Sequence, residues 1–148
     1  MKGNHVIVKT ILKNKGDAVI TVGVYESVRD AMHAMVERKI AALVLTNGSE
    51  VIGVVSERDI LRAISDRGAA ILNAPVGHIV TGPLVAVSPE ETTKRVMHTM
   101  THSRIRHLPV MQNDQLVGIV SVGDVVKYRL EELEMESNVL RDLAIAAR

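Results

Sequence analysis

Two short segments of the chain combine residue types that can bind hydroxyl and phosphate groups. Residues 53–59 read GVVSERD and residues 118–124 read GIVSVGD, so each segment places a Ser and an Asp three residues apart after an apolar run. A helix that begins at the Ser would direct its first amide hydrogens outward, and such amides bind phosphate or ribose oxygens. An Asp carboxylate can accept hydrogen bonds from the two vicinal hydroxyls of a ribose. The two segments therefore indicate recognition of a ribose phosphate.

The same spacing also has a purely structural interpretation. A Ser hydroxyl accepts hydrogen bonds from amides of the first helical turn, and an acidic residue three positions later stabilises the positive end of the helix. This S-x-x-D arrangement is common at helix starts. The two interpretations are compatible, and recurrence of the arrangement favours binding in addition to capping.

The two segments belong to an internal repeat. A shift of 65 positions aligns residues 19–62 with residues 84–127 without a gap, and 11 of the 44 pairs are identical. Because the apolar positions recur as well, we interpret the halves as two copies of one structural unit that bury faces against each other about a pseudo-two-fold axis. The cleft between such copies is the natural place for a ligand.

Each repeat is predicted to fold as a strand, a helix, two strands and a second helix, giving an α/β (α+β) fold with two β-α-β-β-α repeats. Helical spacing of apolar residues is clear over residues 28–39. Asn47-Gly48 predicts a hairpin turn with positive φ at both residues, and residues 112–115 predict its counterpart. The predicted organisation is an N-terminal segment (1–16), a first repeat (17–72), a second repeat (73–130) and a C-terminal helix (131–148).

The C-terminal helix is predicted to be amphipathic. Its apolar residues are spaced alternately by threes and fours, with one interruption at Ser137, and they are Val126, Leu130, Leu133, Leu140 and Ala144. This apolar stripe can pack on its own repeat or contribute to a dimer interface. Both alternatives remain open at the level of the sequence.

The composition restricts the classes of function. Apolar residues make up 47% of the chain and charged residues 24%, which is typical of a globular protein. The formal charge of +1 comes without blocks of one sign, which argues against a nucleic-acid-binding arm. The chain has no Cys, and no apolar run reaches the ~18 residues of a membrane span. The first residues also lack the pattern of a signal peptide, so we expect no membrane association and a cytoplasmic location.

Motifs that would indicate catalysis or metal binding are incomplete. His98 and His102 stand four residues apart on a predicted helix, but no third metal ligand is placed beside them. Residues 118–123 resemble a nucleophile elbow and a phosphate-binding loop, yet the Gly two residues before Ser121 is missing and Asp124 stands where such a loop needs a Lys. We therefore predict no catalytic residue, no metal site and no enzymatic activity.

The chain resembles the tandem CBS domain module, named for cystathionine β-synthase, and in particular the small bacterial proteins that consist of one such pair. The likeness covers nearly the whole sequence: the VITV and LVAV openings, IAALVL and IRHLPV, the two G-h-h-S-x-x-D segments, and the closing GIVSVGDVVK. The resemblance implies an adenosine-containing ligand in the cleft between the repeats. AMP is the expected ligand, with ATP, ADP, NAD and S-adenosylmethionine as alternatives, and no cofactor is required.

The resemblance also assigns roles to residues. In the family the motif Asp binds the ribose, the motif Ser lies near ribose and phosphate, and a residue of the opening strand lies against adenine. Carried over to this chain, these positions are Asp59, Ser56 and Thr21 in the first repeat, and Asp124, Ser121 and Ala86 in the second.

Phosphate needs cations, and the two repeats differ in the basic residues they offer. The second repeat has Arg104, Arg106 and His107 where the first has Lys39, Ala41 and Ala42, whereas Arg58 stands where the second repeat has Gly123. A solvated strand end is the alternative interpretation of Arg106 and His107. The two sites should therefore differ in affinity, and one of them can be empty.

The function predicted from these observations is a regulatory module that senses an energy or metabolite signal. Ligand binding would favour the arrangement of the repeats that closes on the nucleotide. A homodimer would pass the signal to an unidentified protein target in trans. The alternative is a ligand-free structural or partner-binding scaffold, which is favoured by Ala41 and Ala42 at positions where the second repeat is basic.

Overall fold

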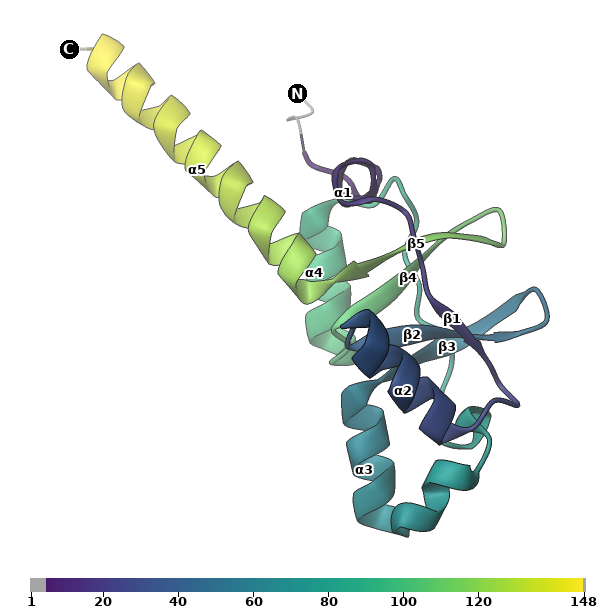
Figure 1. The fold of residues 1–148 in the computed structure, drawn as a ribbon. Coiled ribbons are helices and arrows are strands. Elements are labelled where there is room, and N and C mark those ends of the chain that lie inside the picture. Colours follow the sequence, from purple (N-terminus) through teal and green to yellow (C-terminus); the bar gives the residue numbers. More distant parts are fainter. Residues whose placement is uncertain (1–4, 148) are drawn as a thin grey trace. The chain divides into compact units, whose positions relative to one another are not determined.

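The computed structural model describes residues 5–147 and shows the mixed α/β fold predicted from the sequence (Figure 1). Its contacts divide the chain into two compact units. The first-repeat unit comprises residues 18–86. The second-repeat unit combines the residues from Val87 onward with the described residues up to Asp17. The N-terminal segment thus folds with the second repeat and not with the first, to which it is directly connected.

In the first-repeat unit, a three-stranded sheet carries two helices. Strand β1 (Thr21–Gly23) pairs in parallel with β2 (Ala42–Asn47), which pairs antiparallel with β3 (Glu50–Ser56). Helix α2 (Val28–Arg38) precedes β2, and α3 (Glu57–Arg67) follows β3 before the two 3-10 turns η1 (Ala69–Asn73) and η2 (Val76–His78). Strand β2 is apolar and buried over four consecutive residues, as expected of a strand covered on both faces.

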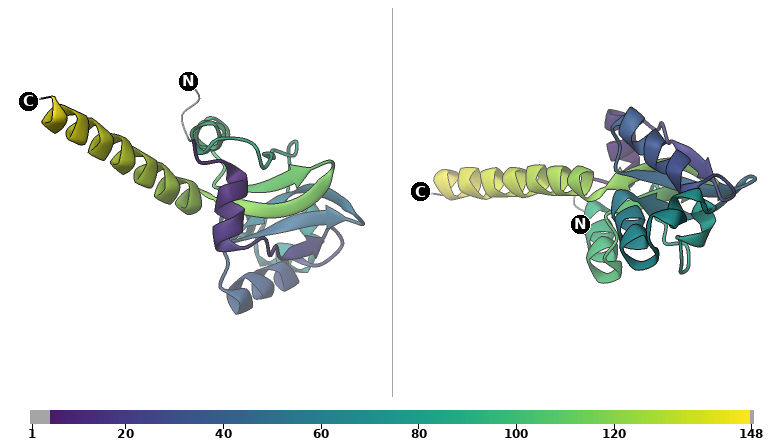
Figure 2. Two further views of the ribbon diagram at one scale, coloured as in Figure 1. Left: turned by 90° about the horizontal axis from the view of Figure 1, so that it is seen from above. Right: turned by 60° about the horizontal axis from the view of Figure 1, so that its bottom comes forward.

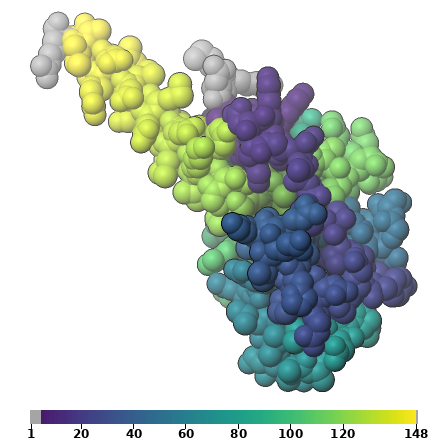
Figure 3. Space-filling view, in the orientation of Figure 1, coloured from purple at the N-terminus to yellow at the C-terminus, as the bar shows by residue number. Residues whose placement is uncertain are grey.

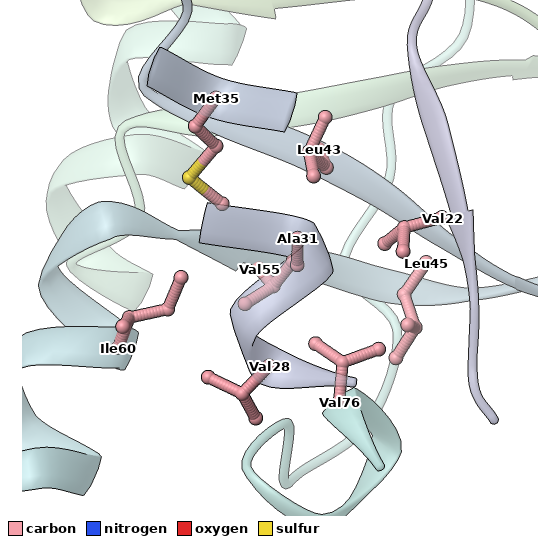
Figure 4. Packing of buried hydrophobic residues seen from close by; sticks show 9 residues of the cluster. All are labelled: Val22, Val28, Ala31, Met35, Leu43, Leu45, Val55, Ile60 and Val76. Carbon is pink, nitrogen blue, oxygen red and sulfur yellow. The ribbon is translucent and has the colours of Figure 1, made fainter. Parts of the chain in front are cut away.

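The core of this unit lies between the sheet and the helices (Figure 4). Residues from both helices, all three strands and η2 meet there, so burial of apolar surface fixes α2 and α3 on the sheet. The members of this cluster are Val22, Val28, Ala31, Met35, Leu43, Leu45, Val55, Ile60 and Val76.

In the second-repeat unit, β4 (His107–Gln112) and β5 (Gln115–Ser121) form an antiparallel hairpin. Helix α4 (Thr93–Ser103) precedes it and α5 (Val122–Ala146) follows it. Helix α1 (Val8–Lys15) lies beside β5, as the left view of Figure 2 shows. A Cβ atom on Gly118 would lie 2.6 Å from a methyl of Leu12, so only Gly lets α1 approach this closely.

The opening strand of the second repeat is shorter than that of the first. The run LVAV retains a single parallel bridge between Val87 and Val110. In the first repeat Val44 donates a hydrogen bond to the Ile20 carbonyl at 3.1 Å. Its counterpart, Pro109, has no amide hydrogen and cannot make this bond.

The two hairpin turns differ in type. The prediction of positive φ at both Asn47 and Gly48 is wrong, because Asn47 ends β2 and the two loop residues are Gly48 and Ser49. Of these, Gly48 alone has positive φ (+61°), with Gly first in the loop as in a type II′ turn. In the second hairpin Asn113 and Asp114 have φ of +52° and +62°, the pattern of a type I′ turn.

Helix α5 is one continuous element of 25 residues, so the predicted C-terminal helix is an extension of the helix that starts at Ser121. Its first part packs on the second-repeat unit: Val125 is fully buried, and the buried Glu132 accepts a hydrogen bond from the Thr93 hydroxyl. Every residue from Leu133 to Ala147 is exposed. The far half of α5, yellow in Figure 3, is uncovered on the face shown there. Packing on its own repeat therefore accounts only for the first half of the helix.

Candidate functional site

Both S-x-x-D segments form complete capping boxes. The Ser56 hydroxyl accepts a hydrogen bond from the Asp59 amide at 3.2 Å, and Asp59 Oδ2 accepts one from the Ser56 amide at 2.7 Å. The matching distances between Ser121 and Asp124 are 3.2 and 2.9 Å. The capping interpretation is thus confirmed for both segments. Each carboxylate is held at the N-terminal end of a helix through one of its two oxygens.

Beside Asp59 the first-repeat unit has an open pocket of about 340 Å³. This volume lies within the range of small-molecule sites. Its lining combines two guanidinium groups and two carboxylates, all on α3, with an apolar wall. The lining residues are Val54, Asp59, Arg62, Ala63, Asp66, Arg67, Ile79, Val80 and Thr81.

Asp59 keeps the capacity to bind a ligand. Its Oδ2 is engaged by the amide and the hydroxyl of Ser56, at 2.7 and 2.9 Å. Within residues 18–86, no Lys or Arg side chain lies within 4.0 Å of its carboxylate. The second oxygen, Oδ1, can therefore accept hydrogen bonds from a molecule in the pocket.

Asp124 is already paired. The Lys15 ammonium lies 2.7 Å from Asp124 Oδ2 and also donates to the Ile119 carbonyl at 3.1 Å. Partial burial by itself would raise the pKa of Asp124, but the hydrogen bonds from Lys15 and Ser121 and the Lys15 charge outweigh it and hold this pKa below its usual range. Next to Lys15, the Asn14 side chain donates to the Tyr128 hydroxyl at 2.8 Å. The end of α1 therefore covers the second Ser-Asp pair.

Two of the predicted basic residues of the second repeat, Arg106 and His107, lie next to the start of α5 through their backbone. His107 is opposite Ser121 in the hairpin, and the Arg106 carbonyl accepts a hydrogen bond from the Val122 amide at 2.8 Å. The Arg106 side chain is exposed. Arg104 is also exposed and ends α4 with φ of +55°.

Asp59 is the one sequence-predicted site residue that lines the open pocket. Four other predicted residues of this unit lie outside the pocket lining. Ser56 caps α3, Arg58 is exposed on α3, and Thr21 is exposed on β1. Ala86 is half-buried at the end of the unit. Sequence reasoning missed the pocket residues Arg62, Arg67 and Thr81, as well as Lys15. The spacing of Arg62 and Arg67 from Asp59, three and eight residues along one helix, places all three on one face and could have revealed them.

A second hollow of the first-repeat unit is apolar. It has a volume of about 640 Å³ and lies between α2 and α3. Val36 and Leu61 at its border are 73% and 68% exposed. Its lining residues are Met32, Met35, Val36, Lys39, Ile40, Ala41, Glu57, Ile60, Leu61 and Ile64.

Residues 5–147 contain no group of three or more His, Asp or Glu side chains that could hold a metal ion. His98 and His102 stack on α4 with ring centroids 5.9 Å apart. Over the same range, no helix combines the length and the apolar character needed to cross a membrane.

Two halves with the same strand and helix order, each with one capped Ser-Asp pair, match a known family model. The model of the CBS domain matches residues 11–66 and again residues 76–131. The chain belongs to the CBS domain family. The first CBS match begins within α1, although α1 packs with the second CBS repeat.

The CBS relatives include both longer proteins and structures of similar size. The mitochondrial CBS domain-containing protein CBSX3 of Arabidopsis thaliana is 34% identical over 134 residues, which are 84% of this chain and 65% of that protein. An uncharacterized 33.4 kDa protein of Thermofilum pendens is 35% identical over 101 residues, which are 68% of this chain and 33% of that protein. This chain thus spans less than two thirds of these relatives.

Solved structures of CBS proteins share the fold. The CBS-domain protein ATU1752 of Agrobacterium tumefaciens is 39% identical, with a TM-score of 0.81 and coverage of 87% of this chain and 97% of that one. The CBS domain pair of MJ0100, solved with 5′-methylthioadenosine and S-adenosyl-L-methionine, has a TM-score of 0.75 at 21% identity and coverage of 86% and 98%.

Proposed function

We propose that this CBS pair is a regulatory module that binds an adenine nucleotide without converting it. The observation that carries the proposal is the open pocket in which Asp59, held in place by its capping box, lies close to Arg62 and Arg67. The adenosine ligands of the MJ0100 pair support an adenosine-containing molecule here. We propose AMP, with ATP, ADP, NAD and S-adenosylmethionine as alternatives.

Each part of a nucleotide has a chemical counterpart in the pocket. The free oxygen of Asp59 can accept hydrogen bonds from the ribose hydroxyls, and bonds to a charged acceptor are the stronger kind. Arg62 and Arg67 present planar guanidinium groups, which match the geometry of phosphate. Ile79 and Val80 supply apolar surface for the base.

We propose binding without turnover because of the chemistry of the pocket. Its lining contains no His, Ser, Lys or Cys, and the Thr81 hydroxyl makes no hydrogen bond to the Asp59 or Asp66 carboxylate, so no nucleophile is paired with a base among these lining residues. A bound nucleotide would act by differential affinity, shifting the chain toward the conformation that binds it better. The shift would be read by a protein target in trans, and the exposed half of α5 is a surface on which such a target could bind.

The module is further proposed to work as a homodimer. Support comes from the α2–α3 groove, because monomeric proteins rarely leave a large contiguous apolar surface uncovered. A second copy that buries this groove would remove Val36 and Leu61 from water in both copies at once. Sedimentation of Leu61→Glu should give monomers, whereas Leu84→Glu, a change outside the groove, should leave the dimer intact. A monomeric wild-type chain would refute the dimer.

A scaffold without ligand is the second candidate function. The observation that favours it is the pairing of Asp124 with Lys15, which neutralises the charge of the motif carboxylate in the second repeat. Calorimetric titration of AMP, ATP, NAD and S-adenosylmethionine, each with its 2′-deoxy analogue as a control, separates the two functions. Binding of one ligand with loss of affinity for the deoxy analogue supports the sensor. If none of the four binds, the scaffold is the better description.

A further inference from the structure

We infer that Lys15 is a built-in occupant of the Asp124 site, so that the unmodified chain binds one nucleotide, at Asp59. This inference rests on the proposed nucleotide binding and adds a selectivity between the two repeats. The opening strand of each repeat is preceded by a segment that packs with the other repeat: residues 6–16 before β1, and residues 74–82 before the LVAV run.

These two segments dock on their units through the same backbone hydrogen bonds. In the first-repeat unit the Val76 amide donates to Glu26 at 2.7 Å, and the Val28 amide donates to Ala74 at 2.9 Å. In the second-repeat unit Val8 donates to Glu91 at 2.9 Å, and Thr93 donates to Val6 at 3.0 Å. Glu26 and Glu91, like Val28 and Thr93, are 65 residues apart and thus counterparts in the repeat. Helix α1 is therefore the counterpart of the segment at η2.

Each of the two segments ends at a Gly with positive φ. Gly82 has φ of +92° and Gly16 has φ of +97°. Thr81 and Lys15 each stand directly before one of these glycines. Thr81 is short and lines the open pocket beside Asp59. Lys15 is long enough to reach the Asp124 carboxylate.

Two other residues that line the open pocket have counterparts in the second repeat that bond to the end of α1. Val54 lines the pocket, and the carbonyl of its counterpart, Ile119, accepts the second hydrogen bond of Lys15. Ala63 lines the pocket, and 65 residues later stands the much larger Tyr128, whose hydroxyl bonds to Asn14. In the second site an ammonium group thus contacts the Asp124 carboxylate, and a phenol side chain stands where its counterpart lining the open pocket is only an Ala.

A nucleotide at Asp124 would have to displace Lys15. The ammonium has two protein acceptors at 2.7 and 3.1 Å, and the two side chains are 33% and 23% exposed. Neutral ribose hydroxyls cannot replace the charge of the ammonium at this carboxylate. Within its own unit, residues 18–86, Asp59 has no Lys or Arg that a ligand would have to displace in this way.

The experiment counts AMP molecules bound per chain by calorimetry. The wild type should bind one AMP. Lys15→Ala should add a second binding event, whereas Lys15→Arg should keep one site because a cation remains. The matched control is Lys13→Ala, at an exposed position two residues away on α1, which should also keep one site. Asp59→Ala should abolish the wild-type event, and Lys15→Ala in that background should restore one site. If Lys15→Ala alone does not open the filled site, Lys15→Ala with Tyr128→Ala must.

The outcomes separate this inference from the function on which it rests. Two AMP molecules bound to the wild type would overturn the role of Lys15 and leave nucleotide binding intact. The same holds if Lys15→Ala and Lys15→Ala with Tyr128→Ala each bind only one AMP. No binding to any variant would refute nucleotide binding itself. The contact is tested without ligand by carbon NMR of the Asp124 carboxyl, whose pKa should rise in Lys15→Met and stay unchanged in Lys13→Met. An unchanged pKa in Lys15→Met would overturn the contact.

Discussion

The helix starts at Ser56 and Ser121 have the same backbone and side-chain geometry but different surroundings. Each Asp accepts a hydrogen bond from the amide of its Ser, at 2.7 and 2.9 Å, so the local motif is formed equally well in both repeats. The difference lies in what approaches the carboxylate from elsewhere: a pocket beside Asp59, and Lys15 beside Asp124. A capping motif thus positions a carboxylate, whereas residues distant in sequence decide whether that carboxylate is available to a ligand.

Replacement of the two Asp residues should give the most unequal result. Asp59→Ala should weaken AMP binding roughly 5- to 150-fold, because loss of a charged hydrogen-bond partner costs about 1–3 kcal/mol. Asp124→Ala should change this affinity by less than about 2-fold. Titration calorimetry measures both, with Ser56→Ala as a control that weakens the cap but keeps the carboxylate. A larger effect of Asp124→Ala would reverse the comparison.

The two motif glycines should differ in their tolerance of a methyl group. In Gly118→Ala the new Cβ would lie 2.6 Å from the buried Leu12, and overpacking of this kind costs about 1–3 kcal/mol. In Gly53→Ala the closest atom is a Val80 methyl at 3.2 Å, so a smaller loss is expected. Urea denaturation of both variants gives the comparison. Equal losses of stability would show that Leu12 and Val80 can move aside equally easily for a new methyl group.

The pocket arginines should matter for phosphate and not for the nucleoside. Arg67→Ala should weaken AMP about 10-fold, by roughly 1.4 kcal/mol, and leave adenosine nearly unchanged. Arg58→Ala is the control, because Arg58 lies on the same helix outside the pocket. A larger effect at Arg58 would restore the phosphate role assigned to it from the sequence.

Removal of the Lys15 charge should have the smallest effect and should depend on pH. Lys15→Met should lower the free energy of unfolding at pH 7 by about 0.2–1 kcal/mol, as for other partly exposed ion pairs. The pKa of Asp124 is lowered in the folded chain, so the pair stabilises the chain above the unfolded pKa of about 4 and loses this effect as pH falls through the folded pKa. Wild type and variant should therefore converge in acid, whereas Lys13→Met should match the wild type throughout.

The repeat, both capping boxes and the order of the elements could be predicted because they depend on local chemistry. Helix caps involve residues three apart, and apolar spacing reports the period of each element. The turn at Gly48 deviates by one residue, because strand β2 continues through Asn47 and shifts the loop. Such boundaries depend on strand pairing more than on the turn residues themselves.

The state of the second site could not be predicted in this way. The contact between Lys15 and Asp124 joins residues 109 positions apart, and no periodicity or motif connects them. The same limit applies to the open pocket, because Thr81 and Asp59 come from separate segments that the fold brings to one place. Arg106 and His107 form a basic cluster that is visible in the sequence, whereas nothing in the sequence marks Lys15 as a cation that contacts the Asp124 carboxylate.

The docking of α1 on β5 also sets the order in which the elements can fold during synthesis on the ribosome. Residues 18–86 are contiguous and contain every strand and helix of their unit, so that unit can finish folding as soon as it has emerged. Helix α1 is translated before it but finds its partner strand about 100 residues later. Until β5 appears, Val8 and Ile11, which are fully buried in the finished structure, remain uncovered on the nascent chain. Helix α1, although translated before the first-repeat unit, is therefore among the last of these elements to reach its native place.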